Sequence, residues 1–120
     1  MISINFRDPR SIYEQVRDGF RELIISGVLS VGEKMPSVRE LAATLTINPN
    51  TIQRAYRELE HEGYIVSAPG KGSFVALPQE AIDARKTELS DKIKTLAKEL
   101  KALGMSEDEI IILIKGVDKA

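Results

Sequence analysis

Apolar side chains recur every three or four residues in three stretches of the first half of the chain, and this period predicts three amphipathic helices. The first stretch has Ile12, Val16, Phe20, Leu23 and Ile24, the second has Val38, Leu41, Ala42 and Leu45, and the third has Ile52, Ala55, Tyr56 and Leu59. Each set lies on one side of its helix, so the three helices are expected to share a core.

Each predicted helix also carries a start signal. Ser11 with Glu14, and Ser37 with Glu40, have the spacing of a capping box, in which serine and glutamate satisfy free backbone N–H groups. Asn48 is a favourable N-cap, and the proline after it suits the first helical position. The helices are therefore predicted to run from Ser11 to Ser26-Gly27, from Ser37 to Leu45, and from Asn48 to Gly63.

The third helix has a polar face that opens without an acid. Its outward positions are Asn50, Thr51, Gln53, Arg54 and Arg57, whereas its acids, Glu58, Glu60 and Glu62, come later. Two short helices joined by the tight Thr46-Ile47 turn, the second helix polar outside, are typical of a helix-turn-helix motif that reads a DNA groove. A second interpretation of the arginines stays open, because Arg54–Glu58 and Arg57–Glu60 have the spacing of helix salt bridges.

The segments around the first helix are extended. Ile2, Ile4 and Phe6 alternate with polar residues, which is the period of a half-buried strand or an extended arm. Asp8-Pro9 ends that extension. After the helix, residues 28–32 are expected to form a turn into a short extended piece ending at Met35-Pro36.

A β-hairpin is predicted after the third helix. Tyr64–Ser67 and Ser73–Ala76 are short β-prone runs, and they flank the Gly-rich tip Ala68–Gly72. Glycines at a hairpin tip permit positive φ and let the backbone approach a surface closely. A hairpin directly after a helix-turn-helix is a wing.

From Gln79 onward the composition shifts to Ala, Lys, Glu and Leu, and a long helix is predicted up to Gly104. Ile82, Leu89, Leu96 and Leu103 are spaced by seven, with Ile93 and Leu100 in the other core position of a heptad. Ser106 and Glu109 form a third capping box, which predicts a last helix from Glu107 to about Asp118. The chain should therefore end in a helical hairpin.

The last helix is too apolar for one neighbour. Ile110–Ile114 are five consecutive apolar residues, which cover more of the circumference than one packing partner can shield. The simplest second partner is the same hairpin from another copy of the chain. We therefore expect a dimer interface made of Ile82, Leu89, Ile93, Leu96, Leu100, Leu103, Ile110, Leu113, Ile114 and Val117.

Length and composition limit the domain organisation and the kinds of site that the chain can hold. A chain of 120 residues fits one compact module, here residues 1–78, plus an appendage, residues 79–120. With no cysteine and one histidine, neither a disulfide framework nor a conventional zinc site is expected. No targeting leader or membrane-spanning run is recognisable, so a cytoplasmic protein that does not contact a membrane is expected.

Charge narrows the choice of partner. The net charge of −1 argues against a general polyanion binder, but Lys34 to Arg57 contains four basic residues and one acid, Glu40. Specific binding to double-stranded DNA needs such a basic face rather than a basic protein.

No feature of the sequence supports an enzyme or a cofactor. There is no nucleophile–base pair and no metal cluster, and His61 has no partner at a recognisable spacing. Gly70-Lys71-Gly72-Ser73 lacks the preceding glycine and the following helix of a phosphate-binding loop, so contact with a DNA backbone is the better interpretation.

The quoted residues, together with a few spaced motifs, resemble the GntR family of bacterial transcription regulators. The matching words are Pro9-x-x-Ile12-Tyr13-x-Gln15, Gly32-x-Lys34-x-Pro36-Ser37-x-Arg39-x-Leu41-Ala42, Asn48-Pro-Asn-Thr51-x-x-Arg54-Ala-Tyr56-x-Glu-Leu59-x-x-x-Gly63 and Gly70-Lys71-Gly72-x-Phe74-Val75. They cover about the first two-thirds of the chain in the family's order. The short helical C-terminus is similar to that of the YtrA-type subfamily.

The resemblance implies a mainly α (α+β) fold: a winged helix-turn-helix DNA-binding domain followed by a short helical dimerisation hairpin. It also implies that Arg39 lies against DNA, that Thr51 and its neighbours face the groove, and that Gly70 and Lys71 are at the wing tip. Where other branches of the family carry basic residues, this chain has Pro49 and Gln53. The bases that the helix reads are therefore left open.

The sequence thus predicts a homodimeric, sequence-specific transcription regulator, by default a repressor, on an inverted-repeat operator. The expected DNA-binding residues are Ser37, Arg39, Asn48, Asn50, Thr51, Gln53, Arg54, Arg57, Gly70 and Lys71. The alternative is a winged-helix protein-interaction module, which would scatter its basic residues instead of clustering them. Larger members of the family sense small molecules, but residues 79–120 have room for at most a small effector pocket at the dimer interface.

Overall fold

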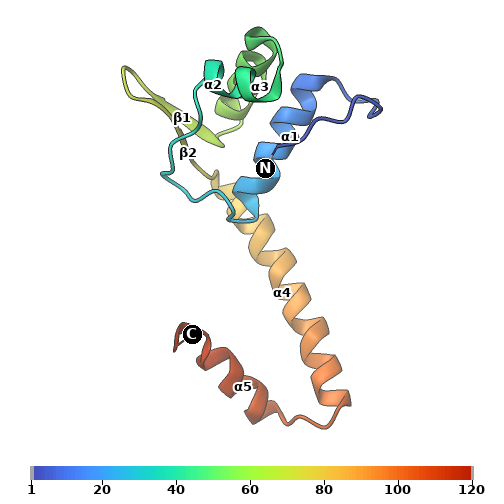
Figure 1. Cartoon of the computed structure of the whole chain (residues 1–120). Helices are drawn as coiled ribbons and strands as arrows, with labels where there is room; N and C mark the ends of the chain where they lie inside the picture. The colour runs from blue at the N-terminus through green and yellow to red at the C-terminus, as the bar shows by residue number, and fades with distance from the viewer. Residues whose placement is uncertain (1, 120) are drawn as a thin grey trace. The chain divides into compact units, whose positions relative to one another are not determined.

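The computed structural model describes residues 2–119, which form five α-helices and one two-stranded antiparallel sheet (Figure 1). The helices are α1 (Ile12–Ile25), α2 (Val38–Leu45), α3 (Pro49–His61), α4 (Gln79–Ala102) and α5 (Glu107–Lys115), and the strands are β1 (Ile65–Ala68) and β2 (Gly72–Val75). A short 3₁₀ helix, Val117–Lys119, follows α5. The chain divides into two compact units between Ile82 and Asp83, within α4. Each unit is described by itself.

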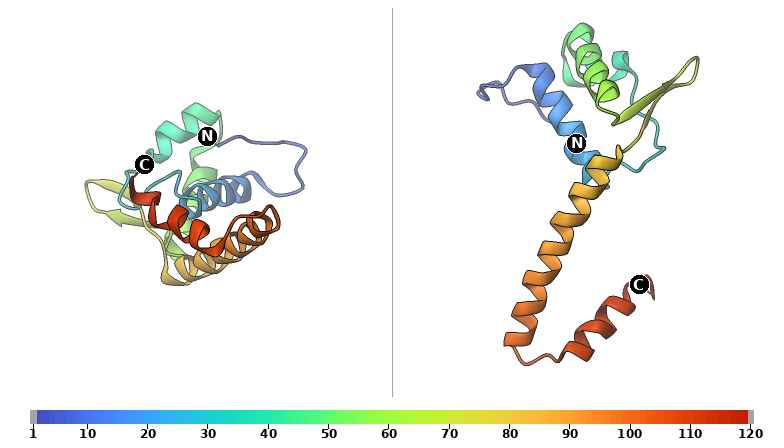
Figure 2. Two further views of the ribbon diagram at one scale, coloured as in Figure 1. Left: turned by 90° about the horizontal axis from the view of Figure 1, so that it is seen from below. Right: turned by 180° about the vertical axis from the view of Figure 1, so that it is seen from behind.

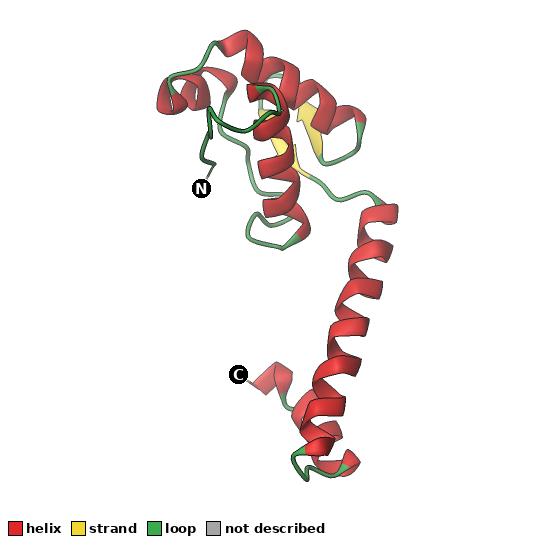
Figure 3. Cartoon of the chain, turned by 90° about the vertical axis from the view of Figure 1, so that its right-hand side faces the viewer, coloured by secondary structure: helices red, strands yellow, loops and turns green. Residues whose placement is uncertain are grey.

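The first unit is a winged helix-turn-helix, as predicted. Helix α3 packs against α1 on one side and α2 on another, and the hairpin of β1 and β2 follows it directly (Figures 1 and 2). In the pairing of the two strands Ile65 lies opposite Val75 and Ala68 lies opposite Gly72. They form the only sheet in residues 2–119 (Figure 3). Lys34 adds a single bridge to Phe74 beside that sheet.

The core lies where α1, α3 and the hairpin meet. Its largest fully buried side chains are Val16, Phe20, Ile52, Leu59, Ile65 and Val75. Phe20 meets the ring of Tyr56 edge to face, with the ring centroids 5.9 Å apart. The predicted apolar stripes of the three helices supply most of this core, although Ile12, Leu23, Val38 and Leu45 are only half-buried.

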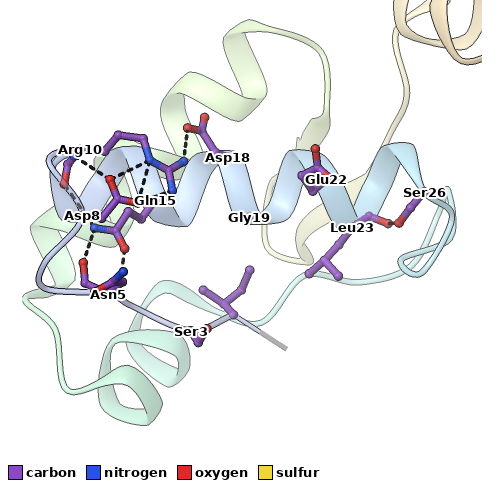
Figure 4. A pocket seen from close by; sticks show the side chains of 11 residues that line it. Ser3, Asn5, Asp8, Arg10, Gln15, Asp18, Gly19, Glu22, Leu23 and Ser26 are labelled. Atoms are coloured by element: carbon purple, nitrogen blue, oxygen red, sulfur yellow. Dashed lines mark hydrogen bonds and ion pairs between the residues drawn. The ribbon is translucent and has the colours of Figure 1, made fainter. Parts of the chain in front are cut away.

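The N-terminal segment is not a strand. Ile2 and Ile4 are half-buried against the core, but Phe6 is 82% exposed, so the alternating pattern does not place all three residues on one buried face. The segment is held by a side chain instead: the Gln15 amide accepts a bond from the Asn5 N–H at 2.9 Å and donates to the Asn5 carbonyl at 3.0 Å (Figure 4).

Two residues of α1 let the segment lie this close to the helix. Gln15, which is 6% exposed, satisfies backbone groups that a second strand would otherwise have paired. Gly19 leaves room beside it, because a Cβ there would lie 2.8 Å from Ile2 Cδ1. The segment is therefore an arm that lies against α1, one of the two forms that the alternation allowed, and it pairs with no strand in residues 2–119.

The second unit differs from the expected hairpin in two respects. Gly104, with φ of +97°, lies in the turn that follows α4. Ser106 and Glu109 form the predicted capping box of α5. However, α5 does not pack along α4 in the described residues, and the two helices lie apart in Figure 1. The α-helix also stops at Lys115 rather than near Asp118, because Gly116 is its C-cap and a 3₁₀ turn follows.

Candidate nucleic-acid interface

The polar face of α3 is displayed as predicted. Asn48 Oδ1 accepts a hydrogen bond from the Asn50 N–H at 2.8 Å, and Pro49 occupies the first turn. Asn48, Asn50, Gln53, Arg54 and Arg57 are exposed, whereas Thr51 is half-buried. Since the buried stripe of α3 is anchored in the core, these side chains form a fixed outward row with no acid in its first turn.

Glu58 of α3 and Glu62, the C-cap of that helix, are paired by arginines of α1. Arg17 Nη1 contacts Glu58 Oε2 at 2.7 Å, and Arg21 Nη2 contacts Glu62 Oε2 at 2.7 Å. The alternative helix salt bridges, Arg54–Glu58 and Arg57–Glu60, do not form among the described residues. For the first pair the reason is geometric, because Glu58 is bonded by Arg17 of α1 instead.

Arg54 has an aromatic partner instead of an acidic one. Its guanidinium carbon lies 3.7 Å from the centroid of the Tyr13 ring, and its Nη2 donates to the Tyr13 hydroxyl oxygen at 3.1 Å. Tyr13 is not among the DNA-binding residues predicted from the sequence. The only sequence signal for Tyr13 is its place in the motif Pro9-x-x-Ile12-Tyr13-x-Gln15, and that motif does not say which side chain Tyr13 contacts.

Helix α2 presents Ser37 and Arg39 beside α3. Ser37 Oγ accepts a bond from the Glu40 N–H at 3.1 Å, but within residues 2–119 no return bond joins the Ser37 N–H to the Glu40 carboxylate, so only half of the predicted capping box forms. Arg39 is exposed and has no ion pair with any described residue. It borders a shallow hollow whose other walls are Ala42, Ala43, Thr46, Ile47 and Pro49. The arginine and the start of α3 thus share one surface.

The turn between α2 and α3 is tight without a glycine. Thr46 takes the left-handed conformation, with φ of 56° and ψ of 51°, and ends α2. Its N–H bonds the carbonyl of Ala43, and the Ile47 N–H bonds that of Ala42. A β-branched residue is strained in this region, so the packing of the two helices must hold it there.

The wing tip is a tight turn over Pro69 and Gly70. The Lys71 N–H bonds the Ala68 carbonyl at 2.9 Å, and Gly70 has φ of +74°, which fits the third position of a type II turn. Gly70 and Lys71 are exposed, as a contact with DNA requires.

A groove of about 380 Å³ separates the wing tip from the start of α2. Its walls include three of the predicted DNA-binding residues, Ser37, Gly70 and Lys71, together with Lys34, Glu40 and Tyr56. Lys34 was not among the predicted residues. It lies here because Gly72 has no side chain: a Cβ at Gly72 would be 3.1 Å from Lys34 Cε. Lys34 and Lys71 outnumber the single carboxylate of Glu40, so the groove suits an anion.

The predicted dimer residues lie in a different part of the chain. Leu89, Ile93, Leu96, Leu113, Ile114 and Val117 are exposed, Leu103 is 85% exposed, and Ile82 and Leu100 are half-buried. Ile110 is the exception, since it is buried within the single chain at 9% exposure. No group of three or more His, Asp or Glu able to hold a metal ion occurs in residues 2–119, and none of the described helices is long and apolar enough to cross a membrane.

Comparisons with known proteins agree with this geometry. The family described as bacterial regulatory proteins, gntR family, matches residues 12–75, which run from the start of α1 to the end of the wing. The HTH-type transcriptional repressor YtrA of Bacillus subtilis (strain 168) is 34% identical over 119 residues, covering 98% of this chain and 92% of that protein.

Two solved structures extend the comparison. YtrA from Sulfolobus acidocaldarius, described as a GntR-family transcription factor, is 33% identical with a TM-score of 0.59, over 98% of this chain and 97% of that one. AraR(DBD) in complex with operator ORE1 is 26% identical with a TM-score of 0.54, over 63% of this chain and 93% of that one.

Proposed function

Because the chain belongs to the gntR family of bacterial regulatory proteins, we propose that it is a homodimeric, sequence-specific DNA-binding repressor that acts on an inverted-repeat operator. The observation that carries this proposal is the outward row of α3. Its Asn50, Gln53, Arg54 and Arg57 are exposed, and the first turn of the helix contains no acid. Side chains of these types make hydrogen bonds to base edges and phosphates.

The roles follow from where each side chain lies. Asn50, Thr51 and Gln53 are proposed to face base edges in the major groove, and glutamine can pair bidentately with adenine. Arg39 on α2 and Lys71 on the wing are proposed to contact the DNA backbone on either side of that groove. Ser37, Asn48 and Gly70 are proposed to lie close to the same backbone. Lys34 joins this set, since it lines the same groove as Lys71.

A second copy of the chain is proposed to cover the exposed heptad residues. Leu89, Ile93 and Leu96 are exposed on α4, and Leu113 and Ile114 on α5, in helices that do not shield each other. Apolar surface of this kind marks an interaction site. A two-fold dimer would place two copies of α3 on related half-sites, hence the proposed inverted repeat.

Repression is the proposed outcome of binding. The chain has no described pocket that identifies an effector, and a dimer bound over a promoter would block it by occupancy. The name of the Bacillus subtilis relative, a transcriptional repressor, supports this direction. A small-molecule effector bound between the α4–α5 regions of the dimer stays a proposal without an assigned site.

The alternative, a winged-helix protein-interaction module, predicts scattered basic residues. Lys34 and Lys71 instead share one groove, Arg39 borders the start of α3, and Arg54 and Arg57 extend from α3 itself. This arrangement favours DNA.

Selection of bound sequences from a pool of random duplexes tests the proposal. We expect an enriched palindrome with two half-sites at a constant spacing of about one helical turn or a multiple of it. A pool that shows no enrichment after repeated rounds would contradict sequence-specific binding, and an enriched site without internal symmetry would contradict the homodimer on an inverted repeat.

A further inference from the structure

We propose that Tyr13 is a positioning residue: it holds the guanidinium of Arg54 towards a DNA backbone phosphate at the edge of the groove that α3 enters. The proposal rests on the proposed function, because it takes α3 as the helix that meets DNA. It adds a residue from α1, an element that carries none of the assigned DNA contacts.

The contact between the two side chains has two parts. The Arg54 guanidinium carbon lies 3.7 Å from the Tyr13 ring centroid, which is stacking distance, and Nη2 donates to the hydroxyl oxygen at 3.1 Å. Tyr13 is half-buried and packs against the core, so its ring is a fixed platform. An exposed arginine otherwise samples many rotamers, and holding it in one reduces the entropy lost when it binds a ligand.

The carboxylate that would draw Arg54 away is already occupied. Glu58 lies four residues after Arg54, the spacing at which a helix salt bridge forms. Here Arg17 of α1 takes Glu58 at 2.7 Å. Apart from the bond to Tyr13, the Arg54 guanidinium makes no hydrogen bond or ion pair within residues 2–119, so its other N–H groups stay available.

The position of Arg54 on α3 points to a phosphate rather than a base. With 3.6 residues per turn, Asn50, Arg54 and Glu58 are each about 40° apart around the helix axis. Asn50 is exposed on the outward face, and Glu58 contacts α1. Arg54 therefore lies between the centre of that face and the flank beside α1, where the wall of a groove, its phosphate backbone, would pass. The planar guanidinium matches phosphate oxygens in a bidentate manner.

A double-mutant cycle tests the inference, with the duplex selected by the parent protein as the probe and dissociation constants measured over a series of salt concentrations. Arg54→Ala should make the negative slope of log affinity against log salt shallower by about 0.9 for each subunit. Tyr13→Leu should weaken binding about threefold for each subunit, or about tenfold for a dimer. Tyr13→Phe keeps the ring and loses only the hydroxyl, so it should recover part of that loss.

The decisive comparison is the effect of Tyr13→Leu in two backgrounds. In an Arg54→Ala protein it should change affinity by less than about twofold, because the Arg54 guanidinium is gone and the only other one near the ring among the described residues, that of Arg17 at 5.9 Å from the centroid, is already paired with Glu58. Arg57→Ala is the control background, because Arg57 has no aromatic partner among the described residues. In that protein Tyr13→Leu should still weaken binding about tenfold. Tyr13→Phe carries the same comparison if Tyr13→Leu fails to fold.

Each possible result bears on a separate claim. Equal effects of Tyr13→Leu in the parent and Arg54→Ala proteins would overturn the positioning role, since the loss would then come from the fold alone. An unchanged salt slope in Arg54→Ala would overturn the phosphate contact. If the parent enriches no duplex, the proposed function itself fails before the cycle begins.

Discussion

The hydroxyl of Tyr56 donates a hydrogen bond to the carbonyl oxygen of Pro36 at 2.7 Å, and this bond ties α3 to the residue before the N-cap of α2. The side chain is 5% exposed, and burial raises the pKa of its phenol. The bond and the ring contact with Phe20 together hold α3 against the start of α2 and against α1.

Replacing Tyr56 with Phe should lower the free energy of unfolding by about 1–2 kcal/mol, because the ring packing stays but the Pro36 carbonyl loses its partner. Urea denaturation measures the change. Tyr64→Phe is the matched control, since the Tyr64 hydroxyl makes no hydrogen bond within residues 2–119. If both variants unfold at the same urea concentration as the parent, the bond does not stabilise the motif.

Thr46→Gly should raise the free energy of unfolding by about 0.5–1 kcal/mol. Thr46 has φ of 56°, where a β-branched residue is strained and glycine is not. Thr44→Gly, two residues earlier inside α2, should instead destabilise by about 1 kcal/mol. Thermal melts of the two variants should move in opposite directions, and a lower melting temperature for Thr46→Gly would show that the threonine side chain stabilises the turn in another way.

Acid should remove a stabilising contribution from Asp18. Partial burial works to raise the pKa of its carboxyl, but hydrogen bonds from Arg17 and Arg10 outweigh burial and hold the pKa below the ordinary value of 3.8. The charged form is thus favoured in the folded state, so the contribution is complete above pH 3.8 and is lost as pH falls through the folded-state pKa.

Comparison with Asp18→Asn measures this contribution. The variant should be less stable than the parent near neutral pH, and the difference should shrink as pH is lowered below about 4. Denaturation at a series of pH values gives both curves. A difference that is the same at about pH 6 and about pH 2 would mean that the stabilisation by Asp18 does not depend on its charge.

Arg39→Ala and Gln53→Ala should affect DNA binding in different ways. Arg39 is proposed to contact the backbone, so its loss should weaken binding to all duplexes and reduce the salt slope by about 0.9 for each subunit. Gln53 is proposed to meet a base, so its loss should relax preference at one position of each half-site, by roughly 1–3 kcal/mol of discrimination. Titration of a panel of single-base operator variants separates the two patterns. Variants that both bind like the parent would show that the groove assignment is wrong.

Leu96→Asp or Leu113→Asp should each give monomers that have lost most of their affinity for DNA. Both side chains are exposed in the single chain, so a charge there costs the folded monomer little, but in a dimer contact it would be buried without a partner. Lys98→Gln is a control on the far side of α4, with the same change in net charge. Sedimentation at micromolar protein gives the oligomeric state, and an Asp variant that stays dimeric would contradict the proposed interface.

Features that the sequence predicted correctly are set by neighbours along the chain. Caps at Ser11, Asn48 and Ser106 satisfy N–H groups within three residues, so their spacing is legible without a fold. The apolar period of α3 and the glycine-rich wing tip are local in the same sense. The alternation of Ile2, Ile4 and Phe6 fitted either a strand or an extended arm, and only the tertiary structure decided for an arm, because Gln15 of α1 bonds its backbone where a neighbouring strand would otherwise do so.

Which charges of α3 are paired, and which stay available to DNA, is decided by tertiary structure. Arg17–Glu58, Arg21–Glu62 and Arg54–Tyr13 each join residues 41 positions apart, and the packing of α1 on α3 creates all three. The sequence by itself determined that α3 is a capped helix with a polar face. Only the packing of α1 pairs Glu58 and the C-cap Glu62 with arginines and gives Arg54 an aromatic partner, because a helix cannot specify from its own residues which neighbour will lie beside it.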